Sequence, residues 1–152
     1  MLISHGALRV SVRGNAAYEA ARRYLRHDPA ERSIFRKLEH APHEIHLRLN
    51  SHDDDSYDPN DRTIRWDPHS ALRTAVGGSQ SPALGLAHEA DHATVAAAIR
   101  DADSNRRDPR YDNLEERRVI LGSERHAART LGEAVRHNHA GNCYWVPTPT
   151  SR

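Results

Sequence analysis

Two histidines and a glutamate are spaced in a way that could bind and use a metal ion. The chain contains the pattern H-E-x-x-H at His88, Glu89 and His92. Residues four apart in a helix lie on one face, about 6 Å apart at Cβ, so two imidazoles can converge on one zinc ion. Glu89 lies about 100° around the helix from His88, so its carboxylate can take a proton from the water that zinc activates. The sequence therefore predicts His88 and His92 as zinc ligands and Glu89 as the general base.

A catalytic zinc ion needs a third protein ligand and one open position. In the longer pattern H-E-x-x-H-x-x-G-x-x-H, a glycine and a histidine would occupy positions that are Val95 and Ala98 here. That class is excluded, and the usual remaining ligand is a carboxylate on a following helix. The segment 114–120 offers two candidates, Glu115 and Glu116.

The helical period separates these two glutamates. Glu116 is three residues before Val119 and four before Ile120, so it shares their inward face. We therefore expect Glu116 to be the third zinc ligand. Glu115 is expected to orient an imidazole without contacting zinc. The alternative that both belong to a solvated stripe of Glu and Arg stays open at this point.

Other polar residues carry weaker expectations. Asp91, between the two ligands, is charged and could bond an arginine or an imidazole, or reach solvent. The acidic run 53–55 lacks the glycine and terminal glutamate of an EF-hand, so a solvated loop is expected. His139 and His137 flank a turn where a second metal site is an alternative. Cys143, the single cysteine, is expected to be structural and excludes an internal disulfide framework.

Hydrophobic periodicity and turn residues predict the elements that position these groups. Strands are expected at 8–12, 45–49, 63–66 and 143–146, and helices at 16–25, 29–38, 83–100, 113–121 and 123–136. The strands come mainly first and the helices after, which is typical of an α+β fold. We expect one domain over residues 1–152, in which a small twisted sheet packs on the H-E-x-x-H helix and C-terminal helices follow. The strand at 63–66 is expected to form the edge along which a substrate pairs.

The amino-acid composition argues against two classes of partner, nucleic acids and membranes. The 22 basic and 21 acidic residues give a net charge of +1, so no nucleic-acid partner is expected. No apolar run approaches the roughly 20 residues of a membrane span, so none is expected. A protein or peptide substrate is the expected partner. Two alternatives stay open: a zinc hydrolase acting on cell-wall amide crosslinks, and a non-catalytic module with structural zinc.

With these residues assembled, the chain resembles the NleD-type family of effector zinc metallopeptidases. It most resembles the branch found as C-terminal toxin domains of type VI secretion VgrG spike proteins. The matching segments are 63–68, 77–89 and 115–120, and Arg136, His139, Gly141 and Tyr144 extend the match. The resemblance implies a zincin-like fold, with zinc bound by His88, His92 and Glu116.

The same resemblance implies a biological setting and further site residues. It implies a secreted or injected metalloprotease that acts as a toxin in the target cell, in the periplasm or the host cytosol. A secretion-spike carrier and an immunity protein would be its partners. The zinc layout is also similar in outline to that of clostridial neurotoxin light chains, which use a downstream arginine and tyrosine near the reacting carbonyl. That similarity makes Arg136 and Tyr144 candidates for stabilising the transition state.

Overall fold

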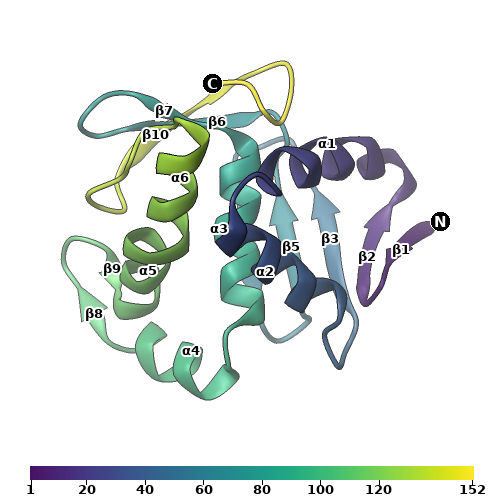
Figure 1. The fold of residues 1–152 in the computed structure, drawn as a ribbon. Helices are drawn as coiled ribbons and strands as arrows, with labels where there is room; N and C mark the ends of the chain where they lie inside the picture. Colours follow the sequence, from purple (N-terminus) through teal and green to yellow (C-terminus); the bar gives the residue numbers. More distant parts are fainter.

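The structure, a computed structural model, describes residues 1–152 and combines helices with three sheets (Figure 1). The largest sheet has five strands in the order β1-β2-β3-β5-β4. Its strands are β1 (Leu2–His5), β2 (Leu8–Ser11), β3 (Ile45–Leu49), β5 (Thr63–Trp66) and β4 (Ser56–Asp58). The central strands β2, β3 and β5 are parallel, whereas β1 and β4 pair antiparallel at the two edges. The predicted α+β class is therefore confirmed, and the structure adds that the sheet is mixed.

The substrate-pairing edge predicted at 63–66 is corrected by this strand order. That segment is β5, which lies between β3 and β4 and so has both of its edges paired. The outer edge belongs to β4, a three-residue strand in the acidic segment that carried no strand pattern. Any extended chain that joins this end of the sheet would therefore pair with β4.

Alternating side chains explain why the sheet has one strongly apolar face. Leu8 and Val10 of β2, and Ile45 and Leu47 of β3, are buried, as the period of two requires. Helices α1 (Asn15–Leu25) and α2 (Pro29–Glu39) lie in front of this sheet in Figure 1. Asp28 caps α2 by accepting a hydrogen bond from the amide of Glu31, and Pro29 suits the first turn. A short 3-10 turn, η1 (Val12–Gly14), connects β2 to α1.

Helix α3 (Pro82–Thr94) carries the H-E-x-x-H pattern and runs through the middle of the molecule. It contacts α1, α2, β4, β5 and β6, and most of its residues are buried. The predicted helix over 83–100 is thus divided in two. Val95 is extended (φ −70°, ψ 150°), and α4 (Ala97–Ser104) begins after it.

The second half of the chain surrounds α3 with short elements. A three-stranded sheet of order β10-β6-β7 and a two-stranded ribbon of β8 and β9 accompany the C-terminal helices. Their bounds are β6 (Ser70–Thr74), β7 (Ser79–Gln80), β8 (Arg107–Asp108), β9 (Asp112–Asn113), α5 (Leu114–Val119), η2 (Ile120–Glu124), α6 (Arg125–Leu131) and β10 (Gly141–Trp145). The η2 segment is a π-helix that joins α5 to α6. Gly132 ends α6 in the left-handed conformation, several residues before the predicted end at 136.

One hydrophobic cluster connects these layers. It joins residues of β2, α1, α2, β3, β5, α3 and α6, with Trp66 and Phe35 among its largest fully buried members. The indole nitrogen of Trp66 donates a 2.8 Å hydrogen bond to the carbonyl of Pro82, which fixes the start of α3 on the sheet. None of the helices combines the length and apolar character that crossing a membrane requires.

Candidate metal centre

The position of α3 is fixed at its first turn by a buried polar network. The hydroxyl of Ser81 accepts from the amide of Leu84, 3.3 Å away, and so caps the helix. The carboxylate of Glu133 in turn accepts from both the amide and the hydroxyl of Ser81, each at 2.7 Å. The helix therefore starts from a fixed point, two turns before the H-E-x-x-H residues.

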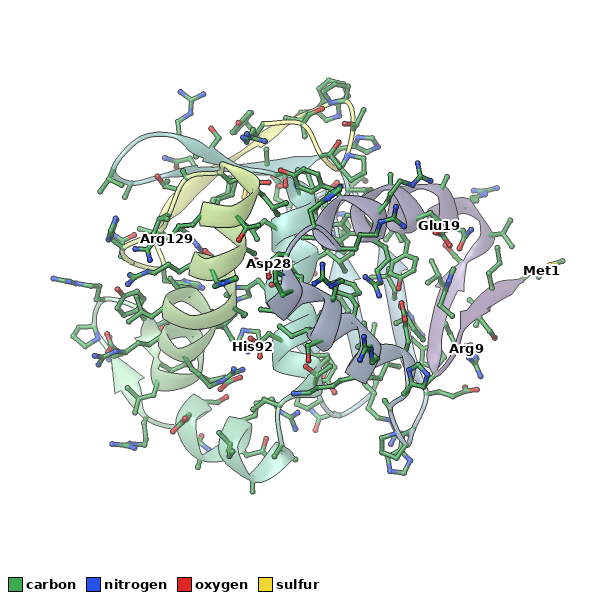
Figure 2. All side chains as sticks on the ribbon, in the orientation of Figure 1. Met1, Arg9, Glu19, Asp28, His92 and Arg129 are labelled. Carbon is green, nitrogen blue, oxygen red and sulfur yellow. The ribbon has the colours of Figure 1, made fainter.

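Three side chains converge on one point beside α3. The Nε2 atoms of His88 and His92 lie 3.0 Å apart. Glu116, in the first turn of α5, places Oε2 2.9 Å from the first of these nitrogens and Oε1 3.2 Å from the second. Figure 2 labels His92, near the centre of the molecule. These three residues form a cluster that could hold a metal ion, and we call them the metal cluster.

The outer nitrogen of each imidazole faces a carboxylate. His88 Nδ1 lies 2.7 Å from Glu124, and His92 Nδ1 lies 2.9 Å from Glu115. A carboxylate in this position accepts the Nδ1 proton, which leaves the lone pair of Nε2 directed into the cluster. When neutral, both histidines are therefore held in the tautomer that a metal ligand needs.

The donor set fits a tetrahedral metal ion. Ligands held at 2.0–2.1 Å in a tetrahedron are separated by about 3.3 Å, close to the 2.9–3.2 Å contacts between these donor atoms. When both imidazoles are neutral and protonated at Nδ1, their two Nε2 lone pairs and the Glu116 carboxylate face each other. Either protons on the imidazoles or a metal ion can balance such a group of acceptors, and two imidazoles with one carboxylate are ligands that zinc accepts.

The electrostatic balance of the cluster favours positive charge at its centre. Burial alone would lower the pKa of His88, but hydrogen bonds to Glu116 and Glu124 outweigh it and raise that pKa to about 10. Burial likewise opposes ionisation of Glu116, yet contacts with His139 and the two histidines hold its pKa well below the usual range. The carboxylates around the imidazoles thus compensate for a cation in this buried place.

Glu89 lies beside the metal cluster with its carboxylate free. Only 7% of the residue is exposed, and no hydrogen-bond donor of the chain binds its oxygens. Its Oε1 is 4.0 Å from His88 Nε2, and burial raises its pKa. It lines two adjoining cavities, of about 430 Å³ and 260 Å³, which also share His88. A carboxylate with a raised pKa that faces a cavity is suited to accept and return a proton.

Asp91 has two polar partners, which explain why a charged residue is accommodated between His88 and His92. Arg118 Nη1 lies 2.8 Å from its Oδ1, and the hydroxyl of Ser123 donates to its Oδ2. The same guanidinium donates to Glu115 at 2.7 and 2.9 Å, and despite burial it lowers the pKa of that carboxyl to about 2. Asp91 therefore connects α3 to α5 and to the π segment, and it holds the arginine that orients Glu115 toward His92.

Glu124 is a site residue that the sequence pattern did not identify. Besides His88, it accepts from Gln80 at 2.9 Å and from the guanidinium of Arg136, whose Nε lies 2.8 Å away. Glu124 follows Gly122 and Ser123, which predicted a break in the helix. The side on which its side chain lies therefore could not be predicted from its spacing to Glu115 and Glu116. Arg136 is bonded to Glu124 and lies 3.2 Å from His88 Nδ1, a place from which it positions the imidazole.

Two further residues lie differently from their expected places. Tyr144 does not line either cavity beside the metal cluster, because its neighbour Cys143 faces that way and strand residues alternate. The guanidinium of Arg73 lies over the Tyr144 ring, 5.3 Å from its centre. His139 lines both cavities, with Nε2 3.4 Å from Glu116 Oε2, so it belongs to this site and not to a second one.

The acidic segment also reaches the site, although a solvated loop was expected. Asp55 lines the same two cavities as Glu89, and its Oδ1 accepts from the amide of Asp67 at 2.8 Å. Gly85 on α3 allows this approach, because a Cβ there would lie 2.6 Å from Asp55 Oδ2. Burial raises the pKa of Asp55 to about 8, so this carboxyl is a second proton-carrying group in the cavity.

Comparison with family models, with curated proteins and with solved structures finds no match to this chain. The family resemblance drawn from the sequence therefore stays a prediction. The geometry of the metal cluster and its surroundings is the basis for assigning a function.

Proposed function

We propose that this protein is a zinc-dependent peptidase of zincin-like fold that hydrolyses a peptide bond beside the metal cluster. The observation that carries the proposal is the free, buried carboxylate of Glu89 next to three converging ligands. A structural zinc site is normally closed by four protein ligands, whereas this cluster has three and lies beside cavities. That difference favours a catalytic role over a non-catalytic module.

Each residue of the site has a definite task in this proposal. His88, His92 and Glu116 hold the metal, and Glu115 and Glu124 keep the two imidazoles oriented. Zinc, when bound, supplies a Lewis acid that acidifies water and polarises the substrate carbonyl. Glu89 takes a proton from the water while the oxygen of that water attacks the carbonyl carbon of the substrate. The same carboxyl then gives the proton to the leaving amine as the C–N bond breaks.

Two features support a peptide as the substrate. The unpaired outer edge of β4 can receive an extended chain by main-chain hydrogen bonds. Tyr57, on β4, also lines the larger cavity with Glu89 and both histidines, so the edge and the site adjoin. His139, which lines both cavities, is available to donate to the oxyanion that forms during hydrolysis.

The resemblance in sequence adds a setting to this proposal. We propose that the protein acts as a delivered effector, with a secretion-spike carrier and an immunity protein as partners. Expression of the chain in the bacterial periplasm and in the cytosol tests where it is toxic. Toxicity of the wild type that Glu89→Gln abolishes would support an effector, and equal growth with both would contradict it.

The substrate class is tested by incubating the zinc-loaded protein with a denatured proteome and, separately, with purified peptidoglycan. We expect new protein N-termini in the first sample, absent when the protein carries Glu89→Gln. Release of muropeptide fragments from peptidoglycan, with an unchanged proteome, would instead make the protein a cell-wall amidase. No product from either substrate would contradict a hydrolase.

A further inference from the structure

A pocket of about 740 Å³ lies immediately beyond the metal cluster along α3. Ala93, Thr94 and Val95 line it, so its wall begins at the residue after the ligand His92. The helix rises about 1.5 Å per residue, which places these residues roughly 2–5 Å further along the axis than His92. The pocket is therefore close enough to receive a side chain of a substrate bound at the metal cluster. We call it the basic pocket, for the charges described next.

The lining of this pocket is basic and contains no acidic residue. Its cations are Arg36, Lys37, Arg62 and Arg100, and the fifteen lining residues include neither Asp nor Glu. Arg36, Lys37 and Arg62 take part in none of the ion pairs of the structure. On a protein whose net charge is only +1, three uncompensated cations around one pocket form a local anion-binding field.

The basic pocket is also lined by apolar side chains, among them Ile45, Ala93 and Val95. A cavity lined by both apolar and cationic groups suits a side chain that has a hydrocarbon part and an anionic end. The side chains of glutamate and aspartate in a peptide have this chemistry.

Arg100 joins the basic pocket to the cavity that contains Glu89. It lines both spaces, as do Tyr57 and Pro59. Its guanidinium lies over the Tyr57 ring at 5.5 Å and 3.5 Å from the carbonyl of His92. Its Nε is buried without a hydrogen-bond partner. A substrate that crosses from the metal cluster to the basic pocket would pass this arginine.

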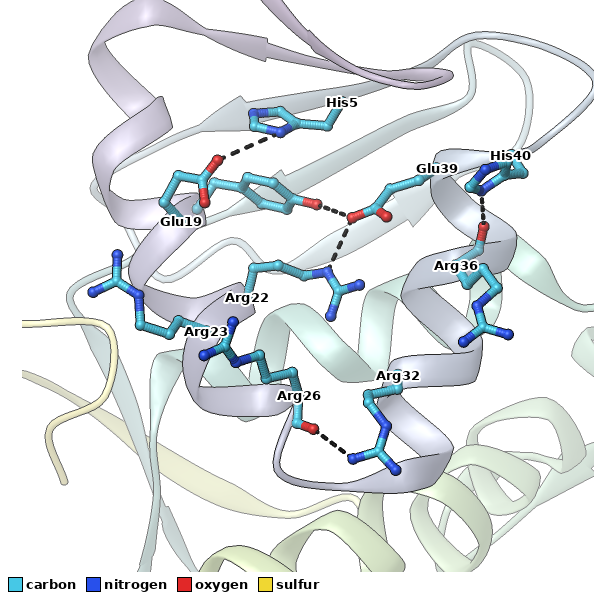
Figure 3. A pocket seen from close by; sticks show the side chains of 10 residues that line it. His5, Glu19, Arg22, Arg23, Arg26, Arg32, Arg36, Glu39 and His40 are labelled. Atoms are coloured by element: carbon cyan, nitrogen blue, oxygen red, sulfur yellow. Dashed lines mark hydrogen bonds and ion pairs between the residues drawn. The ribbon is translucent and has the colours of Figure 1, made fainter.

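The groove next to the basic pocket extends the positive charge. It lies between α1 and α2 and shares Arg36 and His40 with the basic pocket. Figure 3 shows the arginines of this groove, where Arg22 bonds Glu39 and Arg32 bonds the carbonyl of Arg26. An acidic segment longer than one residue would therefore meet further cations beyond the pocket.

We infer that the basic pocket is the specificity subsite of the proposed peptidase and selects an acidic residue within about four residues of the cleaved bond. This inference rests on the proposed function and names its substrate class. A nucleic acid is disfavoured, because the pocket has no Phe or Trp and Arg100 covers the ring of Tyr57, its one tyrosine. Arg100 already pairs with Asp101 at 3.3 Å, so selection acts through charge by pairing the substrate carboxylate with Lys37 and Arg62.

The test begins with a peptide library cut by the zinc-loaded wild type. We expect Asp or Glu to be enriched at one position near the cleaved bond. For the best peptide, replacing that Glu by Gln should lower kcat/KM about tenfold. The ratio of kcat/KM for the Glu peptide to kcat/KM for the Gln peptide is then measured in the double variant Lys37→Gln, Arg62→Asn. There it should fall below about threefold. Asn is chosen at position 62 because Arg62 has a positive φ (52°), which Asn tolerates.

Arg129→Gln is the matched control, since Arg129 is exposed on α6 and lines none of these pockets (Figure 2). It should leave the ratio at its wild-type value. Cleavage without any preference for Asp or Glu would overturn this inference and leave the proposed peptidase standing. The inference would also be overturned if the double variant still cleaved the Glu peptide with a kcat/KM about tenfold above that for the Gln peptide.

A binding measurement separates this inference from catalysis. Fluorescence anisotropy would compare a fluorescein-labelled Glu-containing peptide with its Gln analogue on Glu89→Gln protein. Weaker binding of the Gln analogue, with the difference lost in the Lys37→Gln, Arg62→Asn background, would support the acidic subsite even if no peptide were cleaved and the peptidase itself failed. An oligonucleotide of equal charge would be compared with the unlabelled Glu peptide as a competitor. Displacement of the labelled Glu peptide at a lower concentration of oligonucleotide than of unlabelled peptide would overturn the inference in favour of phosphate recognition.

Discussion

The two neighbouring glutamates of α5 act on the metal cluster from different sides. Glu116 faces both inward nitrogens, whereas Glu115 reaches the outer nitrogen of His92 and is held by Arg118. Adjacent helix residues point about 100° apart, so only one of them can face the metal. Their roles follow from helix geometry, although their side chains are chemically identical.

Glu116→Gln and Glu115→Gln therefore should differ in zinc binding. The first removes an anionic ligand and should abolish stoichiometric zinc. The second leaves the three ligands in place and should weaken zinc binding about 10- to 100-fold, because the His92 ring loses its orienting acceptor. Competition with a chelator of known zinc affinity measures both, with exposed Glu44→Gln as the control. Loss of zinc in Glu115→Gln but not in Glu116→Gln would reverse the assignment.

Glu31, in the first turn of α2, is a buried acid without a partner. It is fully buried, and neither carboxylate oxygen has a hydrogen-bond donor. Burial, with the nearby charges of Asp28 and Asp91, raises its pKa from 4.5 to about 8. Because the folded-state pKa is the higher one, folding favours the protonated form. The stability it contributes is complete below about pH 4.5 and is lost as pH rises toward 8.

Glu31→Gln should remove this pH dependence, because the amide does not ionise. The free energy of unfolding of the wild type should fall relative to the variant by up to about 1.4 kcal/mol per pH unit between pH 5 and 8. Urea unfolding of both zinc-saturated proteins across this range measures the difference. The control Glu44→Gln should show the same change of unfolding free energy with pH as the wild type. A constant difference between Glu31→Gln and wild type would show that Glu31 is ionised in the folded protein.

At the scale of elements, the π segment decides where Glu124 points. A π turn contains more residues than an α turn, so η2 shifts the phase of every residue after it. Sequence periodicity identified α3 and the Glu115–Glu116 helix because their apolar positions follow a regular period. The same reasoning could not give Glu124 a direction, since the Gly122–Ser123 break hid the number of residues in the turn.

Asp91 forms a polar connection between α3 and the α5–η2 segment that is separate from the His–Glu contacts of the metal cluster. Asp91→Ala should destabilise the fold by about 1.5–3 kcal/mol, because a buried, charge-assisted interaction is lost and Arg118 loses one of its two carboxylates. A double-mutant cycle with Ser123→Ala, read by urea unfolding, should give a coupling of at least 0.5 kcal/mol. Additive effects of the two substitutions would show that the Asp91–Ser123 contact contributes nothing, and an Asp91→Ala protein as stable as the wild type would show the same for the whole connection.

At the scale of the whole molecule, the sheet and its covering helices were the predictable part. Strands β2, β3 and β5 and helices α1 and α2 follow clear periods of two and 3.6, and all were located from sequence. The sequence missed strands β1, β4, β6, β7, β8 and β9. Four of them, β4, β7, β8 and β9, have only two or three residues and so show no alternation, and β6 pairs with the distant strand β10. The cavities beside Glu89 are built from short segments far apart in the sequence, so the periodicity could not place Asp55 or His139 in their lining.

Zinc should stabilise the whole fold, because the metal cluster joins α3 to α5 and only the folded chain assembles it. At a free zinc concentration 100 times the dissociation constant, about 2.7 kcal/mol is expected. For a chain of this size that corresponds to a rise in Tm of roughly 5–10 °C. Differential scanning fluorimetry with zinc and with a chelator measures the shift. His88→Ala should abolish it, and a Tm that does not respond to zinc would contradict a metal site.

The most direct test of the central claim is Glu89→Gln, measured for zinc content and for hydrolysis in the same preparation. The amide keeps the volume of the side chain but cannot accept the proton, while the three metal ligands are untouched. Zinc content should equal that of the wild type, and kcat on the best library peptide should fall about 10²- to 10⁴-fold. Full zinc with activity within tenfold of the wild type would show that Glu89 is not the general base.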